Sequence, residues 1–179
     1  MASIQSPNAV GMLTRGAHSM KTVHKSVLIW YSAEEMFNLV TDIGRYPEFL
    51  PWCDHAQVLT EEPGAVTAEV GISLGGIRQV FVTRNVHTPG RKVVLSLLKG
   101  PFSDLQGEWT FSPLGAAPDA VAIPCASTQV AASRACRVDL RLNYSFDNVA
   151  LSALIGPVFD RIAASMVDAF VKRAEQVYV

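Results

Sequence analysis

The sequence NVALSALIGPVFDRIAASMVDAFVKRAEQVYV, residues 148–179, decides the fold. Its apolar residues recur every three or four positions, a spacing that places side chains on one face of an amphipathic helix. Asp147 or Asn148 is suited to cap the helix start. Gly156-Pro157 lies inside the pattern and predicts a kink, or a short helix followed by a long one, because proline removes a backbone donor and clashes with the preceding turn. The predicted stripe comprises Leu151, Leu154, Ile155, Val158, Phe159, Ile162, Met166, Phe170, Ala174 and Val177.

A helix with so apolar a face has to lie on a wide surface, and the preceding residues supply one. Several segments have the composition or the alternating pattern of strands. Turn sequences such as Gly75-Gly76 and Pro89-Gly90 separate them and predict antiparallel pairing. Alternation is cleanest in the last segment, where every second residue from Cys136 to Phe146 is apolar or aromatic. The predicted strands cover residues 22–31, 54–62, 66–73, 77–87, 91–99, 104–111 and 134–147.

Two short helices are predicted after the first strand. Ser32 and Glu35 have the spacing of a capping box and begin the first helix. In the next segment, YPEFLPW at 46–52, two prolines limit any helix to about one turn. This order predicts an α+β, helix-grip fold, in which a curved antiparallel sheet of six to seven strands surrounds the long C-terminal helix.

Length and composition set further bounds. A chain of 179 residues suits one domain, which we assign to residues 20–179. Residues 1–19 lack periodicity and are interpreted as a disordered leader or a remnant of expression, and the Ala- and Pro-rich stretch 115–133 as an excursion between two strands. Hydrophobic residues make up 49% of the chain, so the apolar excess must lie in a core, a cavity or a surface patch. The net charge of −1 excludes a bulk attraction to DNA or anionic lipid.

Cysteine usage and hydropathy bear on location. The three cysteines are odd in number and have no metal-ligand spacing, which predicts reduced thiols in an intracellular protein. No uninterrupted apolar stretch reaches the roughly 18 residues of a membrane span, and the first twenty residues lack the apolar segment of a secretory signal. We therefore expect a cytoplasmic protein with at most transient, peripheral membrane contact.

A sheet that curls around one helix can leave an apolar cavity between its concave face and that helix. Small residues along the helix either make room for such a cavity or only permit close packing, and the sequence leaves both interpretations open. These residues are Ala150, Ala153, Gly156, Ala163, Ala164 and Ala169.

Five segments carry a family resemblance: YPEFLPWC at 46–53, QVFVTRN at 79–85, LLKGPFSDLQGEWTF at 97–111, RVDLRLNYSF at 137–146 and MVDAFVKRAEQVY at 166–178. In these segments the chain resembles the START-like helix-grip superfamily (SRPBCC), which includes polyketide cyclases and dehydrases. Within it, the chain looks like the branch of coenzyme Q-binding proteins and bacterial ribosome-association toxins. That branch usually has a short turn in place of residues 115–133.

The resemblance implies a bacterial protein that binds ubiquinone or a related isoprenoid lipid, requires no metal or catalytic cofactor, and supports respiration or quinone synthesis. The toxin branch implies an alternative, in which the chain binds the large ribosomal subunit and blocks translation initiation. A basic patch would serve that role. The candidate patch comprises Arg78, Arg84, Arg91, Lys92 and Lys99.

A polyketide cyclase or aromatase is a third alternative, but we find no strong candidate for its acid or base and name no catalytic residue.

Eight apolar or aromatic residues are candidate ligand contacts. Tyr46, Phe49 and Trp52 would line or gate the cavity mouth, or alternatively would only plug one end of the sheet. Trp109 has one donor on a large apolar body and is more typical of a core. The others are Phe81 on the sheet and Phe159, Ile162 and Met166 on the helix.

Arg84 is the ninth candidate. It lies on a strand face otherwise occupied by valines. It either donates to a ligand carbonyl or pairs with a carboxylate, for which Glu69 and Glu108 are the candidates.

Overall fold

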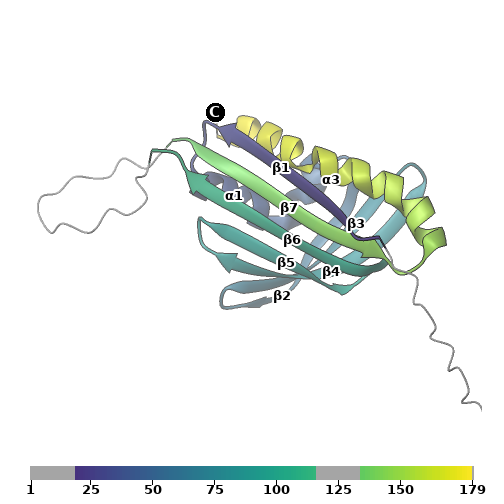
Figure 1. The fold of residues 1–179 in the computed structure, drawn as a ribbon. Coiled ribbons are helices and arrows are strands. Elements are labelled where there is room, and N and C mark those ends of the chain that lie inside the picture. Colours follow the sequence, from purple (N-terminus) through teal and green to yellow (C-terminus); the bar gives the residue numbers. More distant parts are fainter. Residues whose placement is uncertain (1–18, 116–133, 179) are drawn as a thin grey trace, which may run out of the picture.

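The computed structural model describes residues 19–115 and 134–178, which adopt the predicted α+β fold (Figure 1). One seven-stranded antiparallel sheet, of order β1-β7-β6-β5-β4-β3-β2, curves beside the long helix α3. The strands are β1 (Lys21–Ile29), β2 (Cys53–Glu62), β3 (Ala65–Leu74), β4 (Ile77–Thr88), β5 (Lys92–Lys99), β6 (Phe102–Pro113) and β7 (Cys136–Phe146). The helices are α1 (Ala33–Thr41), the 3-10 turn η1 (Ile43–Arg45), α2 (Tyr46–Phe49) and α3 (Val149–Val177).

The helix α3 is continuous. It begins after Asn148, whose side chain accepts a hydrogen bond from the Leu151 backbone N–H at 2.7 Å, as predicted. It runs through Pro157, so the alternative of a short helix followed by a long one is wrong. The break is avoided because Pro157 lies on the solvent side of the helix, whereas its neighbour Gly156 is buried.

The buried face of α3 follows the predicted stripe with two exceptions. Leu154 is 63% exposed and Val177 is 45% exposed. The face of α3 that packs on the sheet is therefore narrower than the apolar pattern of the sequence. In the described part of the chain, α3 is also the one helix long and apolar enough to cross a membrane by length and composition, a property that core helices share.

Local patterns in α1 and β7 are confirmed. Both hydrogen bonds of the capping box form between Ser32 and Glu35. Along β7 the predicted inward residues from Cys136 to Phe146 are buried. Ser145 has the outward parity but is also buried, and its hydroxyl lies 2.7 Å from that of Ser103.

Aromatic rings fill much of the space between sheet and helix. The ring of Phe159 on α3 lies 4.8 Å from that of Phe102 and 4.6 Å from that of Tyr144, measured between centroids. Cys53 and Cys136 are free thiols buried in this core, and burial raises the pKa of each to about 11. The predicted leader (up to residue 18), the excursion at 116–133 and Cys125 lie outside the described residues.

Candidate functional site

A cavity of about 80 Å³ lies between the concave face of the sheet and α3. Strands β3 to β7 form one wall, α3 forms another, and the segment from η1 to the start of β2 closes it. The structure places seven of the nine candidate residues on its lining: Tyr46, Trp52, Phe81, Trp109, Phe159, Ile162 and Met166.

Twelve further lining residues were missed by the sequence analysis. Two of them, Thr83 and Asn85, share the inward parity of Phe81 on β4, so strand parity was the signal that could have found them. The others are apolar core residues that no local pattern distinguishes from the rest of the core, namely Ile43, Leu50, Ala68, Val70, Ile72, Leu95, Leu105, Leu140, Leu142 and Phe170.

Thr83 and Asn85 are the polar pair of the cavity wall, and each is only 5% exposed. The Asn85 amide donates to the Thr83 hydroxyl at 3.2 Å and to the Val66 carbonyl at 3.4 Å. The Thr83 hydroxyl in turn donates to the Asn85 carbonyl oxygen at 3.3 Å. Both amide hydrogens are thus used, whereas the amide oxygen retains capacity to accept another hydrogen bond.

Trp52 contributes an unpaired donor. Its side chain is 5% exposed, and its indole Nε1 has no hydrogen-bond partner in the described part of the chain. A buried donor without a partner costs about 1–3 kcal/mol. A ligand acceptor placed against Trp52 would remove that penalty.

The short helix α2 is fixed against α1 and α3. The Tyr46 hydroxyl donates to the Val40 carbonyl at 2.6 Å, and desolvation raises the pKa of this phenol well above its ordinary value. The rings of Tyr46, Phe49 and Trp109 all contact Phe170 on α3, at centroid distances of 5.4, 5.2 and 5.2 Å. Phe49 itself lines the outside of the cavity wall rather than the cavity.

The structure places Arg84 away from the cavity. Its guanidinium binds the Glu62 carboxylate at 2.9 Å, and its side chain is 43% exposed. Glu69 instead lies 3.2 Å from His55, and Glu108 lies 3.1 Å from Lys92. Pairing with a carboxylate was one of the two predicted roles of Arg84, but both candidate partners were wrong.

The small residues of α3 do not shape the cavity. Ala150, Ala153 and Ala164 are exposed, whereas Gly156 and Ala163 are buried in contact with the fold. None of the six predicted small residues, including Ala169, lines the cavity.

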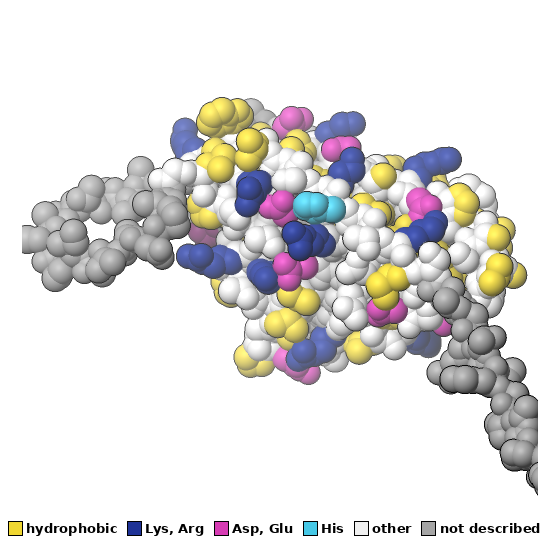
Figure 2. Space-filling view, viewed as in Figure 1, with side chains coloured by type: hydrophobic (Ala, Val, Ile, Leu, Met, Phe, Trp, Pro, Cys, Tyr) yellow, Lys and Arg dark blue, Asp and Glu magenta, His cyan; other side chains and the backbone are white. Residues whose placement is uncertain are grey.

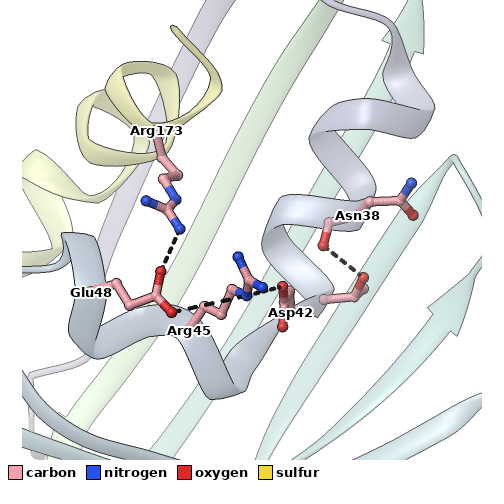
Figure 3. Close-up of polar contacts among 6 residues, drawn as sticks. Asn38, Asp42, Arg45, Glu48 and Arg173 are labelled. Atoms are coloured by element: carbon pink, nitrogen blue, oxygen red, sulfur yellow. Dashed lines mark hydrogen bonds and ion pairs between the residues drawn. The ribbon is translucent and has the colours of Figure 1, made fainter. Parts of the chain in front are cut away.

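A second hollow lies outside the cavity, between α2 and α3. This groove of about 520 Å³ is lined largely by polar residues, and Trp52 lines both it and the cavity. Arg173 of α3 reaches across one side of the groove to Glu48 of α2 (Figure 3).

Three of the five cations of the candidate basic patch are paired with carboxylates. Arg78 pairs with Asp54, Arg84 with Glu62 and Lys92 with Glu108. Figure 2 shows acidic and basic side chains interspersed on the face that it presents, rather than one continuous basic surface.

Comparisons with known proteins agree with this architecture. Residues 29–171 match the model of the family described as polyketide cyclase/dehydrase and lipid transport. The ribosome association toxin RatA of Vibrio cholerae is 40% identical over 89% of this chain and 99% of its own. The coenzyme Q-binding protein COQ10 homolog B of Xenopus laevis is 28% identical over 86% of this chain and 58% of its own. The crystal structure of the Zhui aromatase/cyclase from Streptomyces sp. R1128 shares the fold, with a TM-score of 0.72 and 15% identity over 90% of this chain and 97% of its own.

Proposed function

The chain belongs to the polyketide cyclase/dehydrase and lipid transport family, and we propose that it binds an isoprenoid quinone such as ubiquinone beneath α3. The observation that carries the proposal is the lining of the cavity. Apolar and aromatic side chains surround the polar pair Thr83 and Asn85, and the lining residue Trp52 has a buried indole N–H without a partner among the described residues. This composition is typical of sites for small apolar ligands. The relative named as a coenzyme Q-binding protein supports the choice of a quinone.

The polar groups suit the chemistry of a quinone ring. A quinone carbonyl accepts hydrogen bonds, and Trp52 offers a donor that has no other partner among the described residues. The aromatic rings of Tyr46 and Trp109 offer faces and edges against which a flat ring can pack. The role we infer is binding and delivery of the quinone without chemical change.

Binding requires the cavity to widen. Its volume of about 80 Å³ is smaller than the roughly 150 Å³ of an engineered cavity in another protein that holds benzene. A quinone ring with its substituents is larger than benzene. The wall formed by α2 and Trp52 therefore has to move when the ligand enters.

The test is direct detection of a bound lipid followed by titration. Protein purified from a ubiquinone-producing host is analysed by native mass spectrometry and solvent extraction, and is then titrated with ubiquinone carrying two isoprene units. We expect saturable quenching of tryptophan fluorescence. Trp52→Phe, which keeps a ring but removes the donor, should weaken binding by about fivefold to tenfold, or roughly 1–1.4 kcal/mol.

The matched control is Arg84→Ala, since Arg84 lies outside the cavity. It should bind the quinone as tightly as the wild type. Purified protein that carries no quinone and shows no saturable binding would overturn the proposal.

Association with the large ribosomal subunit is the second candidate function. It is favoured by the relative named ribosome association toxin, which is 40% identical and matches along nearly its whole length. The pairing of Arg78, Arg84 and Lys92 with carboxylates weakens the case for this patch as the RNA-binding surface.

Sedimentation with ribosomal subunits tests this candidate. Co-sedimentation with the large subunit, and a rise in free subunits on overexpression, would favour it. A chain that stays at the top of the gradient at low and moderate salt would exclude it.

A further inference from the structure

We propose that the groove between α2 and α3 is the entrance to the cavity, and that the ion pair between Glu48 and Arg173 holds this entrance closed. The choice of a quinone as the entering ligand rests on the proposed function. The location of the entrance and of its latch rests on geometry alone.

Trp52 connects the two hollows. It lines the cavity of about 80 Å³ on one side and the groove of about 520 Å³ on the other. The preceding residue, Pro51, lines the groove but not the cavity. Displacement of Trp52 would join the two into one space within the range of roughly 300–1,000 Å³ seen for ligand sites. The cavity is too small in its present form, so this wall is where the missing volume is available.

The other walls are held more firmly. The cavity face of the sheet is bonded strand to strand from β3 to β7 by antiparallel ladders, which are interrupted by register shifts at Val82/Thr83 and Phe102/Asp104. The helix α2 has only four residues, and its main chain contributes a single helical turn in which the Leu50 N–H donates to the Tyr46 carbonyl at 2.9 Å. The Trp52 carbonyl accepts a hydrogen bond from the Ser73 N–H of β3 at 2.8 Å, so the side chain of Trp52 and the helix α2, rather than the Trp52 main chain, are the parts that can move.

Arg173 supplies one of the side-chain contacts that hold α2, beside the Tyr46 hydrogen bond and the packing of Tyr46 and Phe49 on Phe170. Its guanidinium lies 2.5 Å from the Glu48 carboxylate (Figure 3). It also lies 5.3 Å from the centre of the Phe49 ring, so one α3 side chain contacts two residues of α2. The Arg173 side chain is 15% exposed, whereas that of Glu48 is 50% exposed. Burial of the guanidinium therefore reduces solvent screening of this ion pair only in part.

Arg45 completes the latch on the other side of Glu48. Its Nε lies 3.9 Å from the second Glu48 oxygen and 3.4 Å from Asp42, which ends α1 (Figure 3). Glu48 is thus shared between η1 and α3. Its carboxylate is the group whose removal should free α2 from both.

The experiment compares Glu48→Gln with Glu175→Gln, an equal change of charge at an exposed position of α3 that lines neither hollow. Both are made in a Trp30→Phe background, because Trp30 is 86% exposed and would mask the buried tryptophans. Acrylamide quenching then reports access to Trp52 and Trp109. Stopped-flow mixing with ubiquinone carrying two isoprene units reports entry and exit.

We expect Glu48→Gln to raise the quenching constant, and to raise the association and dissociation rates by about fivefold, the factor that corresponds to roughly 1 kcal/mol. Glu175→Gln should change neither quantity.

The outcomes separate the two proposals. Increased quenching in Glu48→Gln alone, in a protein that binds no quinone, would support the entrance and overturn the quinone. Quinone binding with unchanged rates and unchanged quenching in Glu48→Gln would overturn the entrance. Equal effects of Glu48→Gln and Glu175→Gln would also overturn it, because they would show a general effect of charge.

Discussion

The Nζ of Lys21 lies 2.6 Å from Oδ2 of Asp160, which ties the first strand to the last helix across 139 positions of the chain. The other Asp160 oxygen accepts a hydrogen bond from the hydroxyl of Tyr144 on β7. Tyr144 is 1% exposed, whereas the Lys21 side chain is 40% exposed. Burial, and then the hydrogen bond to Asp160, raise the pKa of Tyr144 above its ordinary value.

This difference in burial predicts that the variants Asp160→Ala and Lys21→Ala lose unequal amounts of stability. Asp160→Ala leaves a buried hydroxyl unpaired and should lower the free energy of unfolding by about 1–3 kcal/mol. Lys21→Ala removes only an exposed ion pair and should cost about 0–1 kcal/mol. Urea unfolding of the two variants checks the order, and equal losses would show that Tyr144 does not depend on Asp160.

Gly107 should control the size of the cavity from within its wall, because on β6 it shares the inward parity of Leu105 and Trp109. A Cβ at this position would lie 2.8 Å from Leu95 Cγ and 3.1 Å from Leu142 Cδ1, and both leucines line the cavity. Gly107→Ala should therefore push these side chains into the cavity, weaken quinone binding and cost about 1–3 kcal/mol of stability.

Gly44 provides the comparison, because a Cβ there would meet no heavy atom within 4 Å. Gly44→Ala should leave stability within about 0.5 kcal/mol of the wild type. Isothermal titration and thermal unfolding measure the two quantities. Unchanged quinone affinity in Gly107→Ala would mean that Leu95 moves away from the ligand.

The pair Thr83 and Asn85 should behave as one unit. Thr83→Val deprives the buried Asn85 amide of a partner, and Asn85→Leu does the same to the Thr83 hydroxyl, so each should cost about 1–3 kcal/mol. The double variant removes both the Thr83 hydroxyl and the Asn85 amide, so neither is left in the core without the other. Its loss of stability should be smaller than the sum of the single losses, which a double-mutant cycle in urea measures. Simple additivity would contradict the coupling.

His87 should make stability depend on pH. Its Nε2 is buried without a partner in the described residues, and burial lowers the pKa of the imidazole. The unfolded chain takes up this proton near about pH 6.5, before the folded chain does. The His87 contribution is therefore complete above that pH and is lost as the pH falls through the lowered folded pKa.

His87→Leu should reduce the fall in unfolding free energy between neutral pH and the acid range. Denaturant unfolding across a pH series gives the comparison. Parallel slopes for the wild type and His87→Leu would assign the pH dependence to other groups.

The fold was predictable because its elements have strong local periods. The spacing of residues 148–179 identified α3, and the alternation from Cys136 to Phe146 identified β7. Hairpin turns such as Gly75-Gly76, both at positive φ, set the antiparallel order between them. Burial of one face fixes the register of such strands, so local pattern and tertiary packing agree.

The carboxylate partner of Arg84 and the volume of the cavity were not predictable from the sequence. The first depends on the register between strands and the second on the packing of side chains. Parity showed that Arg84 faces away from Phe81, but only the pairing of Arg84 with Thr67, and of Glu69 with Val82, shows which carboxylate lies in reach. The cavity volume depends on how the rings of Phe159 and Phe170 pack, which spacing does not encode.

Pro157 cannot donate a hydrogen bond to the carbonyl of Ala153, one turn earlier, and both residues lie on the wet side of α3. Water can therefore hydrogen-bond to the Ala153 carbonyl, and α3 remains continuous through Pro157 with little loss of stability. One position earlier, at the buried Gly156, a Cβ would be in van der Waals contact with Lys21 Nζ at 3.6 Å and with the Phe146 ring at 3.8 Å. A proline at position 156 would therefore have to place its ring against the sheet, whereas the ring of Pro157 lies in solvent.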